Sequence, residues 1–82
     1  MISNQKEIIM SKKSKILIKF GHKVREERLK RGLTQEEFSS KAGVHRTYIG
    51  MIERAEKNIT LESMKKIANA LNLKLSQLLI DL

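Results

Sequence analysis

Arg46 and Thr47 are neighbouring residues whose side chains suit the edges of DNA bases. They stand where a short helix is expected to begin, and the first turn of a helix in the major groove is the part that reaches base edges. The planar guanidinium of Arg46 matches O6 and N7 of guanine, and Thr47 offers a hydroxyl and a methyl group to a base edge or to thymine. Met51 either faces the same groove or packs loosely. We predict base contacts for all three; the alternative for Arg46 is an ordinary surface arginine.

The stretch Thr34–Glu53 has the pattern of two short helices joined by a tight turn. Thr34 and Glu37 form the Ser/Thr-x-x-Glu pattern of a capping box at the start of the first helix. Gly43 interrupts the pattern where a positive φ is easily adopted, and helical periodicity resumes after Val44. Two helices of this length around such a turn make the helix-turn-helix layout, whose second helix enters the major groove.

His45 and Tyr48 flank the predicted base-contacting residues, and we predict that both contact the DNA backbone. His45 either touches a phosphate or acts as a neutral cap of the helix. Tyr48 is half apolar, so it either packs inward with its hydroxyl on a phosphate or lies toward the two-fold axis of a dimer. Gly50 costs about 1 kcal/mol in a helix, which suggests a close approach of the backbone to DNA or to a neighbouring helix.

The formal charge of +8 makes a polyanion the expected partner. Residues 1–31 carry ten Lys/Arg and three acidic residues, whereas residues 32–82 carry seven and six. The excess charge therefore lies on the N-terminal arm and the first helix, not on the predicted reading helix. This division suits phosphate attraction by one part of the chain and base recognition by another. The alternative is that the lysine-rich N-terminus only keeps a small protein in solution.

Catalysis, cofactors and metals are not expected. The chain has no cysteine and two histidines, which is too few ligands for a structural zinc site. It lacks a Ser/Cys–His–acid set, a phosphate-binding glycine loop and a paired acid and base. No apolar run approaches the length of a membrane span, and the N-terminus lacks the hydrophobic segment of a secretory signal. We expect a cytoplasmic protein that is not an enzyme and that has no membrane partner or small-molecule ligand.

The length of 82 residues indicates one domain, and the absence of proline with few aromatic residues favours an all-α fold. We predict a compact five-helix bundle with helices from about 14 to 31, at 34–42, at roughly 45–54 and at 61–71, and a short fifth helix from Ser76. Residues 14–82 would form the DNA-binding domain, with its C-terminal helix in dimerisation. Residues 1–13 are predicted to be a flexible basic arm, and Met10 could be an alternative start. The expected apolar faces comprise Leu17, Phe20, Val24 and Leu29 in the first helix, and Leu61, Met64, Ile67, Ala68 and Leu71 in the fourth.

The C-terminal leucines exceed what a short last helix needs for its own core. We assign Leu71, Leu75, Leu79 and Leu82 to a homodimer interface; the alternative is that all of them belong to the core of a monomer. A two-fold dimer doubles the footprint over half-sites about 10 bp apart. The expected partner is therefore double-stranded DNA with a two-fold symmetric operator.

The chain resembles the repressor-type (XRE) helix-turn-helix domains of phage repressors and their bacterial relatives, above all in RLKRGLTQEEFSSKAGVHRTYIGMIE. The resemblance spans about residues 17–82 and rests on Gly-Leu-Thr-Gln at the start of the second helix, Ala-Gly-Val at the turn, Ile-Glu-Arg after the third helix and Ala-x-x-Leu in the fourth. Within this family, Arg-Thr-Tyr-Ile at 46–49 and Glu-Arg-x-x-Lys-Asn at 53–58, followed by Ile-Thr-Leu, look like the controller proteins of restriction–modification systems. Those are small homodimeric transcription factors that time endonuclease expression relative to the methyltransferase.

The resemblance implies further roles in binding and in the scaffold. Gln35 is similar to the family's phosphate-contacting glutamine, and the loop residues Arg54, Lys57 and Asn58 occupy the place where the family grips the DNA backbone. A glutamate at the position of Glu53 pairs in the family with an arginine at the position of Arg28. The resemblance therefore implies a structural salt bridge between the first helix and the recognition helix.

Two positions depart from the family pattern. The family commonly has glycine where Ala55 stands, so the third helix is expected to cap differently. Many members have leucine where Glu27 stands, and we expect Leu29 to supply the missing apolar contact.

An alternative function of a different class is open at this point. The chain could be a phage-type repressor, or an antitoxin-like module whose main partner is another protein. In the antitoxin-like case the contact with DNA would be secondary.

Overall fold

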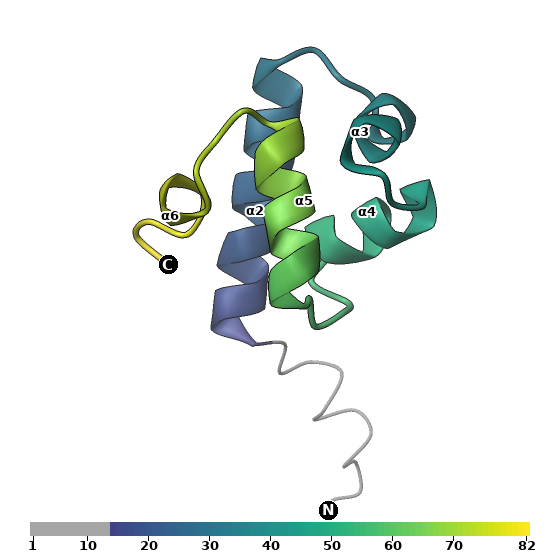
Figure 1. Ribbon diagram of the computed structural model, residues 1–82. Coiled ribbons are helices and arrows are strands. Elements are labelled where there is room, and N and C mark those ends of the chain that lie inside the picture. The colour runs from purple at the N-terminus through teal and green to yellow at the C-terminus, as the bar shows by residue number, and fades with distance from the viewer. Residues whose placement is uncertain (1–13) are drawn as a thin grey trace, which may run out of the picture.

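Residues 14–82, which are the residues that the computed structural model describes, fold into five α-helices without a strand. In the numbering of Figure 1 these are α2 (Lys15–Lys30), α3 (Gln35–Ala42), α4 (Arg46–Glu53), α5 (Leu61–Ala70) and α6 (Leu75–Leu78). The all-α class and the five predicted helices are confirmed, with bounds that differ by a residue or two. The predicted arm at residues 1–13 lies outside the described residues.

Four of the five described helices, α2 to α5, begin at a residue whose side chain accepts a hydrogen bond from an amide of the first turn. Thr34 and Glu37 form the expected capping box: the Glu37 amide donates to Thr34 Oγ1 at 3.0 Å, and the Thr34 amide donates to Glu37 Oε1 at 2.9 Å. This second bond, from the Thr34 backbone, holds the pKa of Glu37 below its usual value. Ser14 and Thr60 cap α2 and α5 through one bond each, since Ser14 Oγ accepts from the Leu17 amide and Thr60 Oγ1 accepts from the Ser63 amide.

The chain leaves α3 and α4 through residues with left-handed backbone. Gly43 has a φ of 72° after α3, as its position in the predicted turn requires. Ala55 has a φ of 60° after α4, where the family pattern has glycine. A Cβ in this region crowds the following carbonyl and costs about 1–2 kcal/mol. A left-handed residue therefore follows α4 although the chain has alanine there and not the glycine that suits this conformation.

The core lies where α4 packs against α2 and α3, and where α5 packs against α3 and α6. Its buried residues come from all five helices and from the end of α5: Phe20, Val24, Phe38, Ile49, Ile52, Ile67, Ala68, Leu71 and Leu78. In Figure 1, α3 and α4 lie on one side of α2 and α6 lies on the opposite side. The helix-turn-helix is thus displayed away from the C-terminal helix.

Gly21 lies directly against the backbone at the end of α4. A Cβ placed on Gly21 would lie 2.5 Å from the Ile52 carbonyl oxygen and 2.9 Å from that of Glu53. Those carbonyls are backbone atoms near the C-terminal end of α4, so they cannot move aside as a flexible side chain would. The absence of a side chain at Gly21 therefore sets the spacing between the two helices. The sequence patterns did not single out this residue.

Two of the positions expected on apolar inner faces are exposed, and one residue assigned to a dimer interface is buried in the core. Leu29 is 52% exposed, so it does not supply the contact that a leucine at position 27 would make. Leu61 is 64% exposed at the start of α5. Leu71, which we assigned to a dimer interface, is fully buried within the subunit and offers no surface to a partner. Helical periodicity gives the direction of a side chain but not the neighbour it meets.

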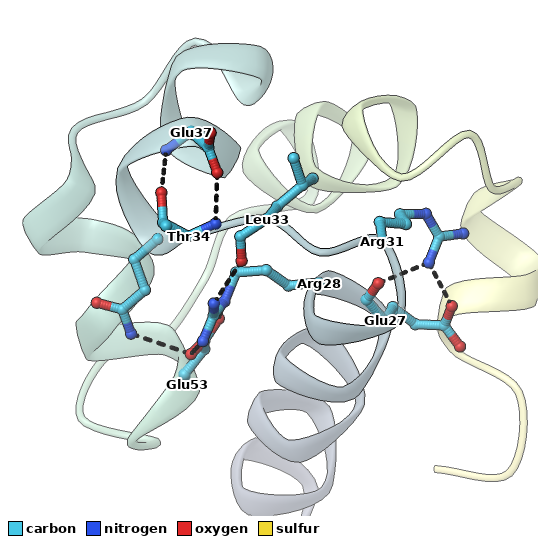
Figure 2. Close-up of polar contacts among 8 residues, drawn as sticks. Glu27, Arg28, Arg31, Leu33, Thr34, Glu37 and Glu53 are labelled. Carbon is cyan, nitrogen blue, oxygen red and sulfur yellow. Dashed lines mark hydrogen bonds and ion pairs between the residues drawn. The ribbon is translucent and has the colours of Figure 1, made fainter.

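Glu27 is buried as an ion-paired residue in place of the family's leucine. Arg31 Nη1 donates to Glu27 Oε1 at 2.7 Å and also to the Glu27 carbonyl oxygen (Figure 2), while Lys30 and Lys23 Nζ lie 3.4 and 3.9 Å from Oε2. The hydrogen bond from Arg31 is the main reason why the pKa of Glu27 lies below its ordinary value. Ion pairs with Glu27, and not an apolar contact of a leucine, therefore stabilise the last turn of α2.

Replacing Gly21 by alanine tests the close approach of α2 and α4. In an ordinary helical position this change stabilises a protein by about 1 kcal/mol. Here we expect Gly21→Ala to lower the free energy of unfolding by about 2–3 kcal/mol, because the new methyl group clashes with backbone carbonyls. Urea denaturation followed by circular dichroism measures the sign. A stability equal to or above that of the unchanged protein would contradict the packing described here.

Ala55→Gly tests the left-handed turn after α4. We expect it to raise the free energy of unfolding by about 1 kcal/mol, because relief at positive φ exceeds the entropy that glycine adds to the unfolded chain. Ala70→Gly is the matched control, since Ala70 lies within α5 and the same change there should be destabilising. Losses of stability in both variants would show that Ala55 is not strained.

Candidate nucleic-acid interface

The outward side of α4 carries the side chains that were predicted to contact bases. Arg46 and Thr47 are exposed at its first turn and Met51 is half-buried one turn further on, whereas Ile49 and Ile52 are buried on the inner side. His45 begins this helix: its Nδ1 accepts a hydrogen bond from the Thr47 amide at 3.1 Å. Of the two roles considered for His45, the cap is therefore present. The imidazole remains exposed beside the presented side chains.

A shallow depression lies between the start of α3 and the outer side of α4. Gln35, Arg46, Thr47, Gly50 and Arg54 line it. Gly50 lies at the centre of the depression, and its lack of a side chain allows Arg54 and Gln35 to come close. A Cβ on Gly50 would lie 3.0 Å from Arg54 Nη1 and 3.6 Å from Gln35 Oε1. The fold thus brings Gln35 beside three of the residues predicted for base and backbone contact. Of the two interpretations of Gly50, the structure shows a close approach to side chains of neighbouring residues, namely Gln35 of α3 and Arg54 after α4.

Arg28 and Glu53 form the ion pair that the family resemblance implied. Arg28 Nε donates to Glu53 Oε2 at 2.7 Å and Nη2 donates to Oε1 at 3.0 Å, while Nη1 donates to the Leu33 carbonyl at 2.8 Å (Figure 2). The exposed fractions of the two side chains are 8% and 2%. Two parallel bonds between a guanidinium and a carboxylate fix orientation as well as distance. This pair therefore holds the end of α4 against α2.

Gln35 is joined to the same carboxylate. Its Nε2 donates to Glu53 Oε1 at 3.0 Å, so the first residue of α3 is fixed relative to the last residue of α4. The carboxylate of Glu53 therefore links three helices. Within the described part of the chain, every buried side-chain nitrogen or oxygen has a hydrogen-bond partner.

The loop after α4 presents the predicted backbone-contacting residues. Arg54, Lys57 and Asn58 are all exposed. Arg54 Nε lies 3.0 Å from Glu56 Oε2, and this contact raises the pKa of Arg54. Its charge is thus retained but partly balanced by its neighbour. Tyr48, by contrast, is half-buried and packs against the core, in agreement with the inward of its two alternatives.

Glu36 is an exposed acidic residue close to Arg46, which is predicted to contact a base. Glu36 Oε1 lies 3.8 Å from Arg46 Nη1, joining the first turns of α3 and α4. Sequence reasoning missed this contact because the two residues are ten positions apart and the angle between their helices is set by the turn.

The remaining predicted interface residues lie elsewhere on the molecule. Leu75, Leu79 and Leu82 are half-buried, and the last two line an apolar groove. The groove is formed by the start of α2, the α4–α5 loop and the C-terminal end, and it is also lined by Ile16, Leu17, Phe20, Asn58, Ile59 and Met64. In the part of the chain that the structure describes, no group of three or more metal-ligating side chains occurs, and no helix is long and apolar enough to cross a bilayer.

Residues 24–78 match the model of the helix-turn-helix family, and this range includes α3, α4 and the Arg28–Glu53 pair. The chain belongs to this family. Control protein C.BamHI of Bacillus amyloliquefaciens is 42% identical over 65 residues, which are 78% of this chain and 80% of that protein. The restriction-modification controller protein C.AhdI from Aeromonas hydrophila has a solved structure with a TM-score of 0.74 and 39% identity, covering 76% of this chain and 94% of that one.

A third relative lies outside the named controllers. The hypothetical transcription factor NHTF from Neisseria gives a TM-score of 0.77 at 32% identity, covering 84% of this chain and 79% of that one. The chain is therefore a DNA-binding helix-turn-helix regulator and not an enzyme. Its fold positions α4 as the recognition helix of this family.

Gly50→Ala tests whether the depression between α3 and α4 matters for DNA binding. A helical alanine should raise the free energy of unfolding by up to about 1 kcal/mol. Its methyl group should displace Arg54 and weaken binding to duplex DNA several-fold. Urea denaturation and fluorescence anisotropy measure the two effects. Asn69→Ala, on the exposed side of α5, is the control that should stabilise without changing affinity; unchanged affinity in Gly50→Ala would remove the depression from the binding surface.

Proposed function

We propose that the protein is a sequence-specific transcriptional regulator that binds a two-fold symmetric operator as a homodimer. We further propose that it is a controller of a restriction–modification system, regulating its own gene and that of the endonuclease. The observation that carries the proposal is the outward presentation of Arg46 and Thr47 on α4 in a chain 42% identical to control protein C.BamHI. Such a regulator acts where the chromosome lies, so the proposed compartment is the cytoplasm.

Base recognition is assigned to Arg46, Thr47 and Met51. Arg46 supports this role because its side chain is 64% exposed at the first turn of α4. A bidentate contact with guanine is worth about 1–3 kcal/mol of discrimination against another base. Thr47 lies beside it and Met51 lies one turn further along the helix.

Backbone contacts are assigned to residues around α4 and give no sequence preference of their own. Gln35 and Arg54 line the depression beside Arg46 and Thr47, which supports their assignment to phosphates. Lys57 and Asn58 are exposed in the loop that follows α4, and their assignment rests on that exposure and on the family resemblance. His45 and Tyr48 complete the set that was predicted from the sequence. Each phosphate neutralised by a cation adds to the salt dependence of binding.

Dimerisation is assigned to the apolar groove and the adjoining leucines. Leu79 and Leu82 line the groove together with Ile59, which belongs to the loop that follows α4. A two-fold contact here would keep both copies of α4 near one duplex, because the loop joins the recognition helix directly to the contact surface. Ile16, at the edge of the groove, is 58% exposed and would be covered in such a dimer. Leu71 is left out because it is buried within the subunit.

The proposal is tested by sedimentation together with a gel shift on the DNA upstream of the gene. We expect a dimer in solution and a shifted complex that random duplex of equal length does not compete away. A monomer that binds both duplexes equally, or a stable complex with a different protein and none with DNA, would favour the antitoxin-like alternative. Adjacent endonuclease and methyltransferase genes would support the controller role.

Arg46→Ala and Lys57→Ala separate base reading from phosphate attraction. The first should cost about 1–3 kcal/mol of binding free energy and relax specificity at one base pair. The second should weaken all duplexes similarly and reduce the slope of log K against log salt by about 1. Arg25→Ala, exposed on α2, is the charge-matched control. Equal losses from both variants on specific and random duplexes would contradict this division.

Ile16→Lys tests the dimer surface without touching the core. Burial of an isoleucine side chain contributes about 1.5–3 kcal/mol, so its loss should raise the dimer dissociation constant by roughly tenfold or more. Leu29→Lys is the matched control, because Leu29 is 52% exposed on the same helix but does not line the groove. Sedimentation equilibrium compares the two. The assignment fails if Leu29→Lys dissociates the dimer and Ile16→Lys does not.

A further inference from the structure

Glu36 places a negative charge on the surface that is proposed to meet a polyanion. It lies in the first turn of α3, is 77% exposed, and its Oε1 is 3.8 Å from Arg46 Nη1. A carboxylate at this place repels phosphates within a Debye length, about 8 Å at physiological salt. It therefore weakens the attraction of DNA next to the side chain on which base reading depends.

Stability gives little reason for this arrangement. Ion pairs between exposed side chains contribute about 0–1 kcal/mol. An acid in the first turn also complements the helix dipole, but Glu37 already supplies one there and closes the capping box. The contact of Glu36 with Arg46 is thus not needed to start α3.

The geometry of the pair is maintained by buried contacts behind it. Gln35, the residue before Glu36, is bonded to Glu53 at the end of α4, and Glu53 is held by Arg28. The first residue of α3 is consequently fixed relative to the end of α4, the eight-residue helix whose first turn carries Arg46. Glu36 then biases where the long side chain of Arg46 points.

We propose that Glu36 is a specificity-determining residue that positions Arg46 for a base and discourages its use on phosphate. This inference rests on the proposed role of Arg46 in base reading. A guanidinium carries five N–H donors, so one edge can face the carboxylate while another donates to O6 and N7 of guanine. If Arg46 bound a phosphate instead, the negative phosphate would lie close to the negative carboxylate of Glu36, and the two would repel each other. The carboxylate therefore reduces affinity for all DNA but reduces it most where Arg46 would otherwise bind the backbone.

Glu36→Gln is the test, because it removes the charge and keeps the shape. Affinities are measured by fluorescence anisotropy for the upstream duplex and for a random duplex of the same length. We expect affinity for the random duplex to rise by about 3-fold more than affinity for the upstream duplex, an amount typical of one exposed ion pair. Relaxed selection should appear at the base pair that Arg46→Ala also affects. Glu26→Gln, exposed on α2, is the charge control and should change both affinities by the same factor.

The double variant Glu36→Gln/Arg46→Ala separates positioning from general charge. If Glu36 acts through Arg46, then in the Arg46→Ala background the change Glu36→Gln should alter the affinities for the upstream and random duplexes by the same factor. An unequal effect that persists without Arg46, or an equal effect in its presence, would overturn the inference.

Failure of the inference is distinguishable from failure of the proposed function. If Arg46→Ala relaxes one base pair and Glu36→Gln does not change the ratio of affinities, only the inference falls. If Arg46→Ala leaves every base pair unaffected, the assignment of base reading falls and the role of Glu36 falls with it. Thermal melting of each variant shows whether the folded state is retained.

Discussion

The buried ion pair between Arg28 and Glu53 is the interaction on which the rest of the arrangement depends. One carboxylate accepts two bonds from Arg28 and a third from Gln35, and Arg28 also holds the carbonyl of Leu33. These bonds join α2, the turn before α3, the first residue of α3 and the end of α4. Removing one partner of such a pair leaves an uncompensated buried charge and costs about 3–5 kcal/mol. The orientation of the recognition helix is therefore a consequence of charge pairing as much as of apolar packing.

Around this pair, backbone geometry fixes how far α4 extends and how closely it lies to α2. His45 caps its first turn, and the left-handed Ala55 ends it directly after Arg54. Gly21 allows α2 to approach the carbonyls at the end of the same helix. These constraints leave eight residues of helix whose inner side is buried and whose outer side carries Arg46 and Thr47. A short helix held at both ends presents its side chains in a defined direction, which base recognition needs.

Features that depend on local sequence could be predicted, and features that depend on the crossing of helices could not. The capping box at Thr34 and the left-handed Gly43 follow from residue types over a few positions, and both are present. The pairing of Arg28 with Glu53 followed from the family resemblance. The expected environments of Leu29 and Leu61 were wrong, because periodicity does not tell which apolar side chains meet another helix. Periodicity placed Leu71 on an inner face correctly, whereas its assignment to a dimer interface was wrong because the side chain is buried within the subunit. The tight contact at Gly21 and the approach of Glu36 to Arg46 arise from interhelical geometry, so no local pattern indicates them.

The most direct test of the central claim is to map the DNA-contacting surface by amide chemical shifts during titration of the protein with its upstream duplex. The claim is that the outer side of α4, held in place by the Arg28–Glu53 pair, delivers the contacts that select a sequence. It requires the largest specific changes at Gln35, Arg46, Thr47, Met51 and the loop at residues 54–58, with small changes along the exposed side of α2. Changes concentrated at Lys15, Lys19 and Lys23, with α4 unaffected, would contradict it and would show that the basic first helix alone attracts DNA.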